Sequence, residues 1–128
     1  MSGQLIEELI RLSAAARENS YSPYSDFKVG AALLANSGKI YTGCNFENAS
    51  FGAGVCAERV ALGSALAAGE RSFEAICVCG ERVITPCGIC RQSLAEFGDM
   101  DVICCAPGGE RKIYRLSALL PEAFELKE

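Results

Sequence analysis

The sequence predicts an α/β fold: a three-layer α/β/α sandwich around a mixed five-stranded sheet. Two continuous apolar runs, residues 75–79 and 102–105, have the character of strands that are buried on both faces. A helical pattern separates them, and a strand–helix–strand crossover makes the two strands parallel. An earlier hairpin signal adds antiparallel pairing, so the sheet is mixed and helices cover both faces. The length of 128 residues, half of them hydrophobic, suits a single domain spanning residues 1–128.

The first part of the chain predicts one helix and one hairpin. Apolar residues recur at helical spacing near the N-terminus, at Leu5, Ile6, Leu9, Ile10, Leu12 and Ala16. Residues 20–25 form a loop. Residues 27–35 and 39–43 flank Asn-Ser-Gly at 36–38, a turn sequence typical between antiparallel strands. A polar, glycine-containing loop follows at residues 45–54.

The second part predicts two helices and three shorter elements. Residues 56–68 are helical and stop at Gly69, a usual helix-ending residue. Thr85 and Pro86 predict the next helix start, because threonine can cap a helix and proline fits its first position. This helix extends to about Phe97. The C-terminal part contains three short elements: a Pro-Gly-Gly turn at 107–109, an edge strand at 112–114 and a helix at 117–120.

Three cysteines indicate a catalytic zinc site. Cys56 begins the sequence Cys-Ala-Glu-Arg, and Cys87 and Cys90 lie in Pro-Cys-Gly-Ile-Cys-Arg. Three thiolates can hold Zn²⁺ and leave its fourth position open for water, which distinguishes a catalytic from a structural site. Glu58 lies two residues from the first ligand, where a carboxylate that does not bind the metal can exchange protons with that water. The pattern matches the described signature of zinc deaminases.

Two arginines are expected beside the thiolates. Cys56 and Cys87 each open a predicted helix, whose N-terminus favours thiolate over thiol. Arg59 follows Cys56 by three residues and Arg91 follows Cys87 by four, so each should lie alongside a ligand. Their guanidinium groups would offset the negative charge of three thiolates on one Zn²⁺ and raise the acidity of its water. Glu58 can share this centre only if the zinc lies off the helix end, because residues two apart point to different helical faces.

Other interpretations of the cysteines remain open. Four cysteines within apolar strands are expected to be small buried hydrophobes: Cys77, Cys79, Cys104 and Cys105. Cys87 and Cys90 alone also match a thioredoxin-like redox motif, which leaves Cys56 unexplained. A closed structural site with four cysteines would need Cys44 as its fourth ligand, although burial is the interpretation we favour for Cys44.

The composition agrees with a small intracellular enzyme, and we expect it to act in the cytoplasm. The net charge is −4, which disfavours nucleic-acid binding. Eight cysteines without a recognisable secretory signal suggest a reducing compartment. No apolar run has the length of a membrane span, so no membrane partner is expected. The chain has no histidine, so acid–base chemistry near neutral pH must use a carboxylate, a thiol or metal-bound water.

Five longer stretches are shared, in the same order, with a known family. They are Phe-Lys-Val-Gly-Ala-Ala-Leu at 27–33, Gly-Cys-Asn-Phe-Glu-Asn-Ala-Ser-Phe-Gly at 43–52, Cys-Ala-Glu-Arg at 56–59, Thr-Pro-Cys-Gly-Ile-Cys-Arg-Gln at 85–92 and Leu-Leu-Pro-Glu-Ala-Phe at 119–124. On these motifs the chain resembles the small, homotetrameric, all-cysteine class of zinc-dependent cytidine deaminases. It departs from the family pattern at Thr85, where serine is frequent, and at Phe51, where tyrosine is frequent.

The resemblance implies a function and a set of site residues. The expected reaction is hydrolytic deamination of cytidine and deoxycytidine to uridine and deoxyuridine plus ammonia, in pyrimidine salvage, with one zinc per chain. Zinc-bound hydroxide would attack C4 of the base while Glu58, its pKa raised by burial, carries protons to N3 and the leaving amine. The implied substrate-binding residues are Asn45 and Glu47 at the ribose hydroxyls, Phe27 beside the nucleoside, Ala57 at the base carbonyl, Thr85 at the leaving amine, and Phe124 from a neighbouring subunit of a homotetramer.

Three rival functions follow from parts of the same pattern. A deaminase of nucleoside antibiotics such as blasticidin S shares the zinc motif, but Asn45 and Glu47 favour an ordinary ribonucleoside. A nucleic-acid-editing deaminase is disfavoured by the acidic charge balance. A thiol–disulfide oxidoreductase or a structural zinc module comes from a different class, and metal content separates it from a deaminase.

Overall fold

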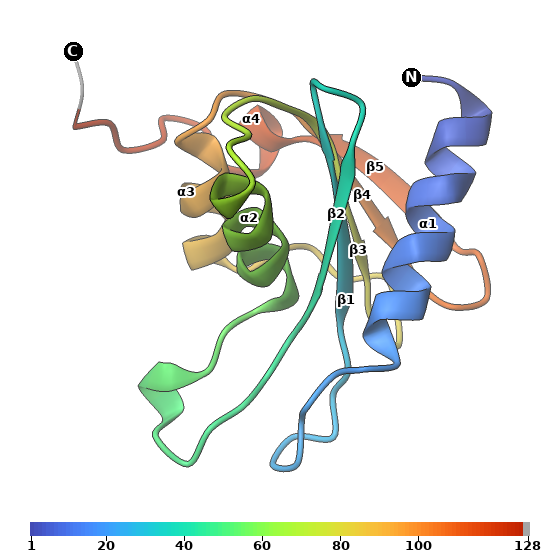
Figure 1. The fold of residues 1–128 in the computed structure, drawn as a ribbon, viewed down its shortest axis with the longest axis vertical. Coiled ribbons are helices and arrows are strands. Elements are labelled where there is room, and N and C mark those ends of the chain that lie inside the picture. The colour runs from blue at the N-terminus through green and yellow to red at the C-terminus, as the bar shows by residue number, and fades with distance from the viewer. Residues whose placement is uncertain (127–128) are drawn as a thin grey trace.

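A five-stranded sheet forms the middle layer of the molecule, and helices cover both of its faces (Figure 1). The computed structural model describes residues 1–126. Its elements are α1 (Gly3–Arg17), β1 (Gly30–Ala35), β2 (Ile40–Cys44), the short 3₁₀ helix η1 (Phe51–Ala53), α2 (Ala57–Ala67), β3 (Phe73–Cys79), α3 (Gly88–Ala95), β4 (Asp101–Cys105), β5 (Arg111–Arg115) and α4 (Leu116–Leu119). The expected three-layer α/β/α architecture is confirmed.

The sheet is mixed, as the sequence predicts. Its strand order is β2-β1-β3-β4-β5. β1 pairs antiparallel with both β2 and β3, and β4 pairs antiparallel with β5. The crossover through α3 makes β3 and β4 parallel. The hairpin turns at residues 36–38, where Gly38 has a φ of 93°, a conformation that favours glycine.

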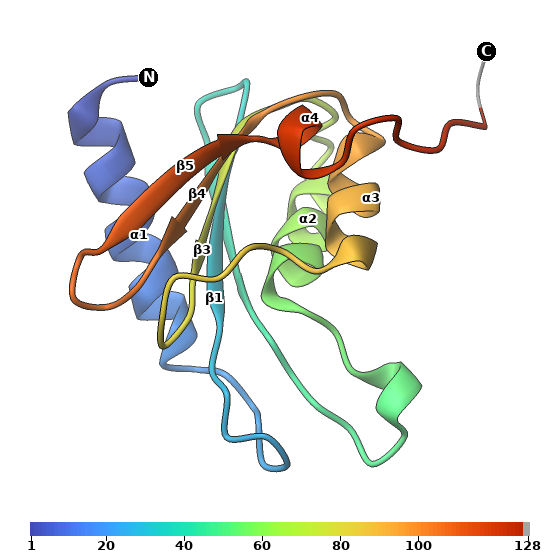
Figure 2. The same ribbon diagram turned by 180° about the vertical axis from the view of Figure 1, so that it is seen from behind.

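Alternate side chains of the strands pack against different helices. α1 lies alone on one face of the sheet, and α2, α3 and α4 lie on the other (Figure 2). Leu33, Ile76 and Val78 belong to the core shared with α2, whereas Leu34 and Cys77 belong to the core under α1. Burial on both faces explains why the central strands are continuously apolar. Among the helices within residues 1–126, none combines the length and apolar character that a membrane span requires.

Among the element boundaries that differ from the sequence expectation, two lie next to the candidate site. The predicted helix start at Thr85 and Pro86 is wrong: α3 begins at Gly88, with Cys87 as its N-cap. Pro86 is fully buried, and the Thr85 hydroxyl accepts a hydrogen bond from Arg91 instead of capping a helix.

The first hairpin strand also begins later than residue 27, at Gly30. The side chain of Asn45 accepts from Val29 N and donates to Phe27 O, so it satisfies the backbone groups that strand pairing would otherwise satisfy. The segment before β1 is therefore held mainly by the side chains of Asn45 and Arg17, the latter donating to Lys28 O, with one backbone bond from Asn45 N to Val29 O.

Gly43 allows α2 to lie directly on the sheet. A Cβ atom at this position would be 2.5 Å from Ala61 N and 2.7 Å from Ala57 O. We expect Gly43→Ala to lower the free energy of unfolding by about 1–3 kcal/mol, because the helix backbone would have to move. Gly63→Ala is the control: its Cβ would meet nothing within 4 Å, and alanine inside a helix should stabilise by about 0.5–1 kcal/mol. Urea unfolding measures both values, and equal stability of the two variants would contradict the packing argument.

Candidate metal centre and substrate pocket

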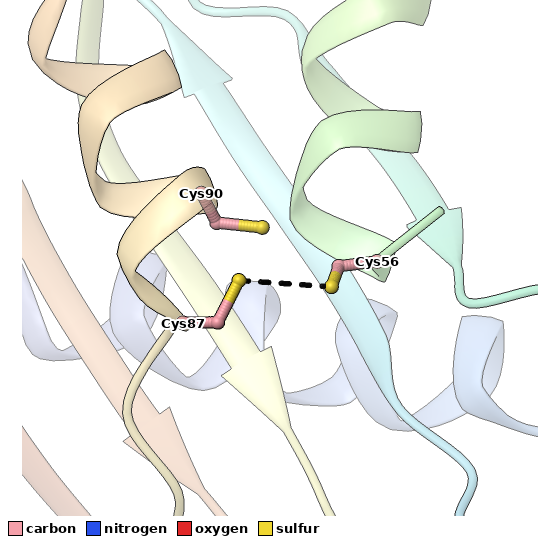
Figure 3. A group of neighbouring side chains, drawn as sticks. All are labelled: Cys56, Cys87 and Cys90. Carbon is pink, nitrogen blue, oxygen red and sulfur yellow. Dashed lines mark hydrogen bonds between the residues drawn. The ribbon is translucent and has the colours of Figure 1, made fainter. Parts of the chain in front are cut away.

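Three cysteines from two helices point toward one another (Figure 3). Cys56 is the N-cap of α2, Cys87 is the N-cap of α3, and Cys90 lies in the first turn of α3. Their three Sγ atoms all lie within 4.8 Å of one another. Two of the thiols therefore sit at helix N-termini, off the ends of the helices, which is the placement that the spacing of Cys56 and Glu58 required.

The cluster has the dimensions of a zinc site. The Sγ atoms of Cys56 and Cys87 are 3.8 Å apart, and two ligands at about 2.3 Å from a tetrahedral Zn²⁺ would be separated by about 3.8 Å. Cys44 is not in the cluster; it ends β2, where it pairs with Gly30. Among the described residues, three thiols and no fourth cysteine therefore favour an open site over a closed one.

Arg59 lies beside this thiol cluster. Hydrogen bonding to Cys90 and then to Cys56 raises the pKa of the Arg59 guanidinium. In the same way, hydrogen bonding by Cys90 and by Arg59 lowers the pKa of Cys56 to about 5, against the opposing effect of burial. Within residues 1–126, the buried Arg59 Nε has no hydrogen-bond partner. The Arg59 guanidinium lies close enough to Cys56 and Cys90 to stabilise both as thiolates, the form that binds a metal ion.

Replacing Arg59 with alanine should weaken zinc binding or slow turnover by about 10–100-fold without unfolding the chain, as expected for a residue that supports metal ligands. Zinc content after dialysis and steady-state kinetics measure the effect. Arg71→Ala is the control, because the Arg71 guanidinium donates to the carbonyl oxygens of Leu66 and Glu70 and does not line the pocket. Parental zinc content and kinetics in Arg59→Ala would refute the charge-offset argument.

Arg91 has a different environment from Arg59. Its guanidinium donates to Pro86 O at 2.7 Å, to Leu119 O at 2.7 Å and to Thr85 Oγ1 at 2.9 Å. It thus ties the segment before Cys87 to the end of α4. Its helical spacing predicted a place beside a thiolate; these contacts add a second role, as a brace for the loop that presents Cys87, which sequence spacing does not reveal.

Glu58 is a buried carboxyl group at the start of α2. Its side chain lines the same pocket as Cys56 and Cys87, and the residue is only 4% exposed. Burial is the largest cause that raises its pKa to about 7, and the charge of Cys56 adds to the effect. A carboxyl group in this range can both accept and donate a proton near neutral pH, as the sequence interpretation expected.

A pocket of about 340 Å³ adjoins the thiols. It is lined by Ser25, Phe27, Val29, Asn45, Glu47, Cys56, Ala57, Glu58, Ile84, Thr85 and Cys87. The structure thus brings five of the six predicted substrate-binding residues to one cavity with Glu58. Sequence reasoning did not single out Ser25, Val29 and Ile84, which carry no recognisable chemical signature in the sequence.

Asn45 and Glu47 organise the wall of this pocket. Asn45 Oδ1 accepts from Ser20 Oγ at 2.5 Å and from Val29 N at 2.9 Å. Glu47 accepts from the backbone N–H groups of Tyr24 and Ser25. The Ser25 hydroxyl also donates to Glu47, and this bond is the main cause that lowers the pKa of the Glu47 carboxyl. Both side chains are therefore fixed by the loop of residues 20–28.

Phe124, the sixth predicted residue, does not line the pocket of its own chain. It is 67% exposed, and its carbonyl accepts a hydrogen bond from Gln92 Nε2 at 2.9 Å. The C-terminal tail that carries it extends away from the three layers (Figure 1). The remaining cysteines of the central strands are fully buried, as expected for core residues: Cys77, Cys79, Cys104 and Cys105.

Comparisons with known proteins agree on one family. The family model described as the cytidine and deoxycytidylate deaminase zinc-binding region matches residues 4–106. The chain is 46% identical to the cytidine deaminase of Sporosarcina psychrophila, over 96% of this chain and 93% of that protein. It is 44% identical to the cytidine deaminase of Halalkalibacterium halodurans, over 94% of each.

A solved structure agrees in fold as well as in sequence. The crystal structure of cytidine deaminase from Burkholderia pseudomallei superposes with a TM-score of 0.89 at 49% identity, and it covers 97% of this chain and 100% of that chain. A zinc-binding family model, a thiol cluster of zinc dimensions and a shared three-layer fold all lead to the same assignment. The chain therefore belongs to the zinc-binding family of cytidine and deoxycytidylate deaminases.

Proposed function

We propose that this protein catalyses the hydrolytic deamination of cytidine and deoxycytidine to uridine and deoxyuridine, with release of ammonia. One observation carries the proposal: a cluster of three thiols of zinc spacing and a buried carboxyl group, Glu58, adjoin one pocket whose size suits a small molecule. Relatives at 44% and 46% identity are named cytidine deaminases.

Cys56, Cys87 and Cys90 would hold the zinc ion, which when bound supplies a Lewis acid that makes water acidic near neutral pH. Glu58 takes up the proton of that water and delivers it to ring N3, which makes C4 electrophilic. Once the water oxygen has added to C4, Glu58, again ionised, takes the proton of the new C4 hydroxyl and delivers it to the amine. The C4–N bond then breaks, ammonia leaves and the C4 carbonyl of uridine forms. A carboxyl group with a pKa of about 7 is suited to both steps.

The other pocket residues orient the nucleoside. The buried N–H of Ala57, at the positive end of α2, binds the carbonyl oxygen of the base. The carbonyl of Thr85 accepts from the amine that leaves. Asn45 and Glu47 bind the sugar hydroxyls, and Phe27 packs against the nucleoside. Phe27 is itself covered by the Arg82 guanidinium, 5.3 Å from its ring centre.

A spectrophotometric assay tests this function. The ultraviolet absorbance that distinguishes cytidine and deoxycytidine from their products should fall as uridine and deoxyuridine form. Free cytosine and adenosine should not react. A chelator should stop the reaction, and added zinc should restore it. Blasticidin S is included as a rival substrate. Reaction with blasticidin S alone would contradict the proposal, and so would a metal-free protein that reduces disulfides.

The proposed active form is a homotetramer, acting in the cytoplasm in pyrimidine salvage. The exposed Phe124 on an extended tail supports a pocket that a neighbouring subunit completes. Light scattering combined with kinetics should show an active tetramer. A fully active monomer would overturn the contribution of Phe124 across subunits.

A further inference from the structure

Ser25 joins two residues of the substrate pocket. Its hydroxyl donates to Glu47 Oε2 and accepts from Phe27 N at 3.0 Å. Its backbone N–H also donates to Glu47 Oε1 at 3.1 Å. All three residues line the pocket. One serine therefore contacts both the Glu47 carboxylate and the backbone of Phe27.

The loop that contains Ser25 depends on hydrogen bonds for its position. Tyr21 and Tyr24 are 62% and 60% exposed, so its large side chains do not anchor it in the core. The loop is held instead by Tyr21 N bonding to Asn45 O at 3.1 Å and Glu47 N bonding to Tyr21 O at 2.8 Å. Asp26, next to Ser25, has a φ of 56° in the left-handed region. This turn directs Phe27 back to the pocket, although it is a conformation that non-glycine residues rarely adopt.

The Glu47 carboxylate can accept one more hydrogen bond. A carboxylate offers about four acceptor positions. Oε1 already accepts from Tyr24 N at 2.9 Å and from Ser25 N, and Oε2 accepts from the Ser25 hydroxyl. The remaining acceptor position is on Oε2, and its direction is set by the Ser25 hydroxyl. A substrate hydroxyl would meet an ionised group that is already oriented.

We propose that Ser25 is a positioning residue for the sugar end of the substrate, through its hydroxyl bond to Glu47 and its acceptance of Phe27 N–H. The inference rests on the proposed nucleoside deamination and deepens it. It assigns to Ser25 a contribution to the binding of a sugar hydroxyl, and not to the chemistry at the base.

The test compares Ser25→Ala with a matched control. Ser37 makes the same pair of bonds far from the pocket: its hydroxyl donates to Glu70 Oε2 at 2.6 Å and accepts from Lys39 N at 3.3 Å. Both variants lose the same kind of bond, so Ser37→Ala shows how much such a loss affects the kinetics through protein stability alone. The parent protein is assayed first, and failure to deaminate cytidine would refute the proposed function before Ser25 is tested.

Ser25→Ala should raise the KM for cytidine about tenfold and leave kcat within about threefold of the parent, because a bond to a charged group is lost away from the reacting atoms. The loss in kcat/KM should be much smaller for whichever analogue, 2′-deoxycytidine or 3′-deoxycytidine, lacks the hydroxyl that Glu47 binds. Ser25→Thr, which keeps the hydroxyl, should restore the parental KM.

Equal losses on cytidine and on both deoxy analogues would assign Ser25 a structural role only and overturn the proposal. An unchanged KM, or an equal effect of Ser37→Ala, would also overturn it. If Ser25→Ala does not stay folded by circular dichroism, Ser25→Cys, whose thiol is a weak donor, replaces it under the same criteria.

Discussion

Glu58→Gln should lower kcat for cytidine by about 10²–10⁴-fold while the variant retains its fold and its zinc. Glutamine has nearly the same shape as glutamate, but it cannot take up or release a proton. The residue does not belong to the thiol cluster, so metal content should stay at the parental value. Glu58 is buried, and this burial raises the pKa of its carboxyl group to about 7. A neutral amide at this position should therefore not destabilise the folded protein.

The measurement combines single-turnover kinetics with metal analysis and thermal unfolding. Glu74→Gln is the control, since Glu74 is an exposed residue of β3 and lies outside the pocket. Its kinetics should match the parent. Substantial turnover by Glu58→Gln would remove Glu58 from the proton-transfer role, and loss of zinc from that variant would mean that Glu58 supports the metal directly.

Replacing Cys90 with serine should abolish both zinc retention and turnover. Cys90 is fully buried, and its Sγ is one of the three within 4.8 Å. A serine hydroxyl is a poor zinc ligand, so two thiols would remain to hold the ion. Without the metal the pKa of water returns from about 7 toward 15.7, and the loss of rate should exceed about a thousandfold.

Cys44→Ser is the matched control for this prediction. Cys44 is half-buried at the end of β2 and is not a member of the cluster, so its variant should keep one zinc per chain and parental kinetics. Metal analysis by atomic emission checks both proteins. Loss of zinc from Cys44→Ser would indicate a closed site of four cysteines, and full activity of Cys90→Ser would exclude a metal centre at these three thiols.

Most of the secondary structure could be predicted from local patterns in the sequence. The apolar runs, the Asn-Ser-Gly turn and Gly69 placed the strands, the hairpin and the end of α2 close to their observed positions. The start of α3 was predicted too early, with Thr85 as the cap where the structure has Cys87. Pro86 is needed in the core and Thr85 is bonded to Arg91, two tertiary contacts that outweigh the local preference for a helix start.

The candidate metal ligands were predictable because their chemistry is rare. Three cysteines at these spacings, followed by glutamate and arginine, have few other uses, and the structure brings their sulfur atoms together. Physical reasoning alone did not identify the candidate substrate-binding residues. Asn45, Glu47 and Phe27 resemble ordinary loop and core residues, and only likeness to a family suggested their place in the pocket.

The sequence alone determined the order of elements, the mixed sheet and the three thiols, since periodicity, turn residues and metal-ligand chemistry are local properties of the chain. Only the tertiary structure decided that Arg91 braces a loop, that Ser25 holds Glu47 and that Cys44 lies apart from the other thiols. These relations join segments from separate parts of the chain. Their physical basis is packing and hydrogen bonding across the folded sheet, which no spacing along the chain encodes.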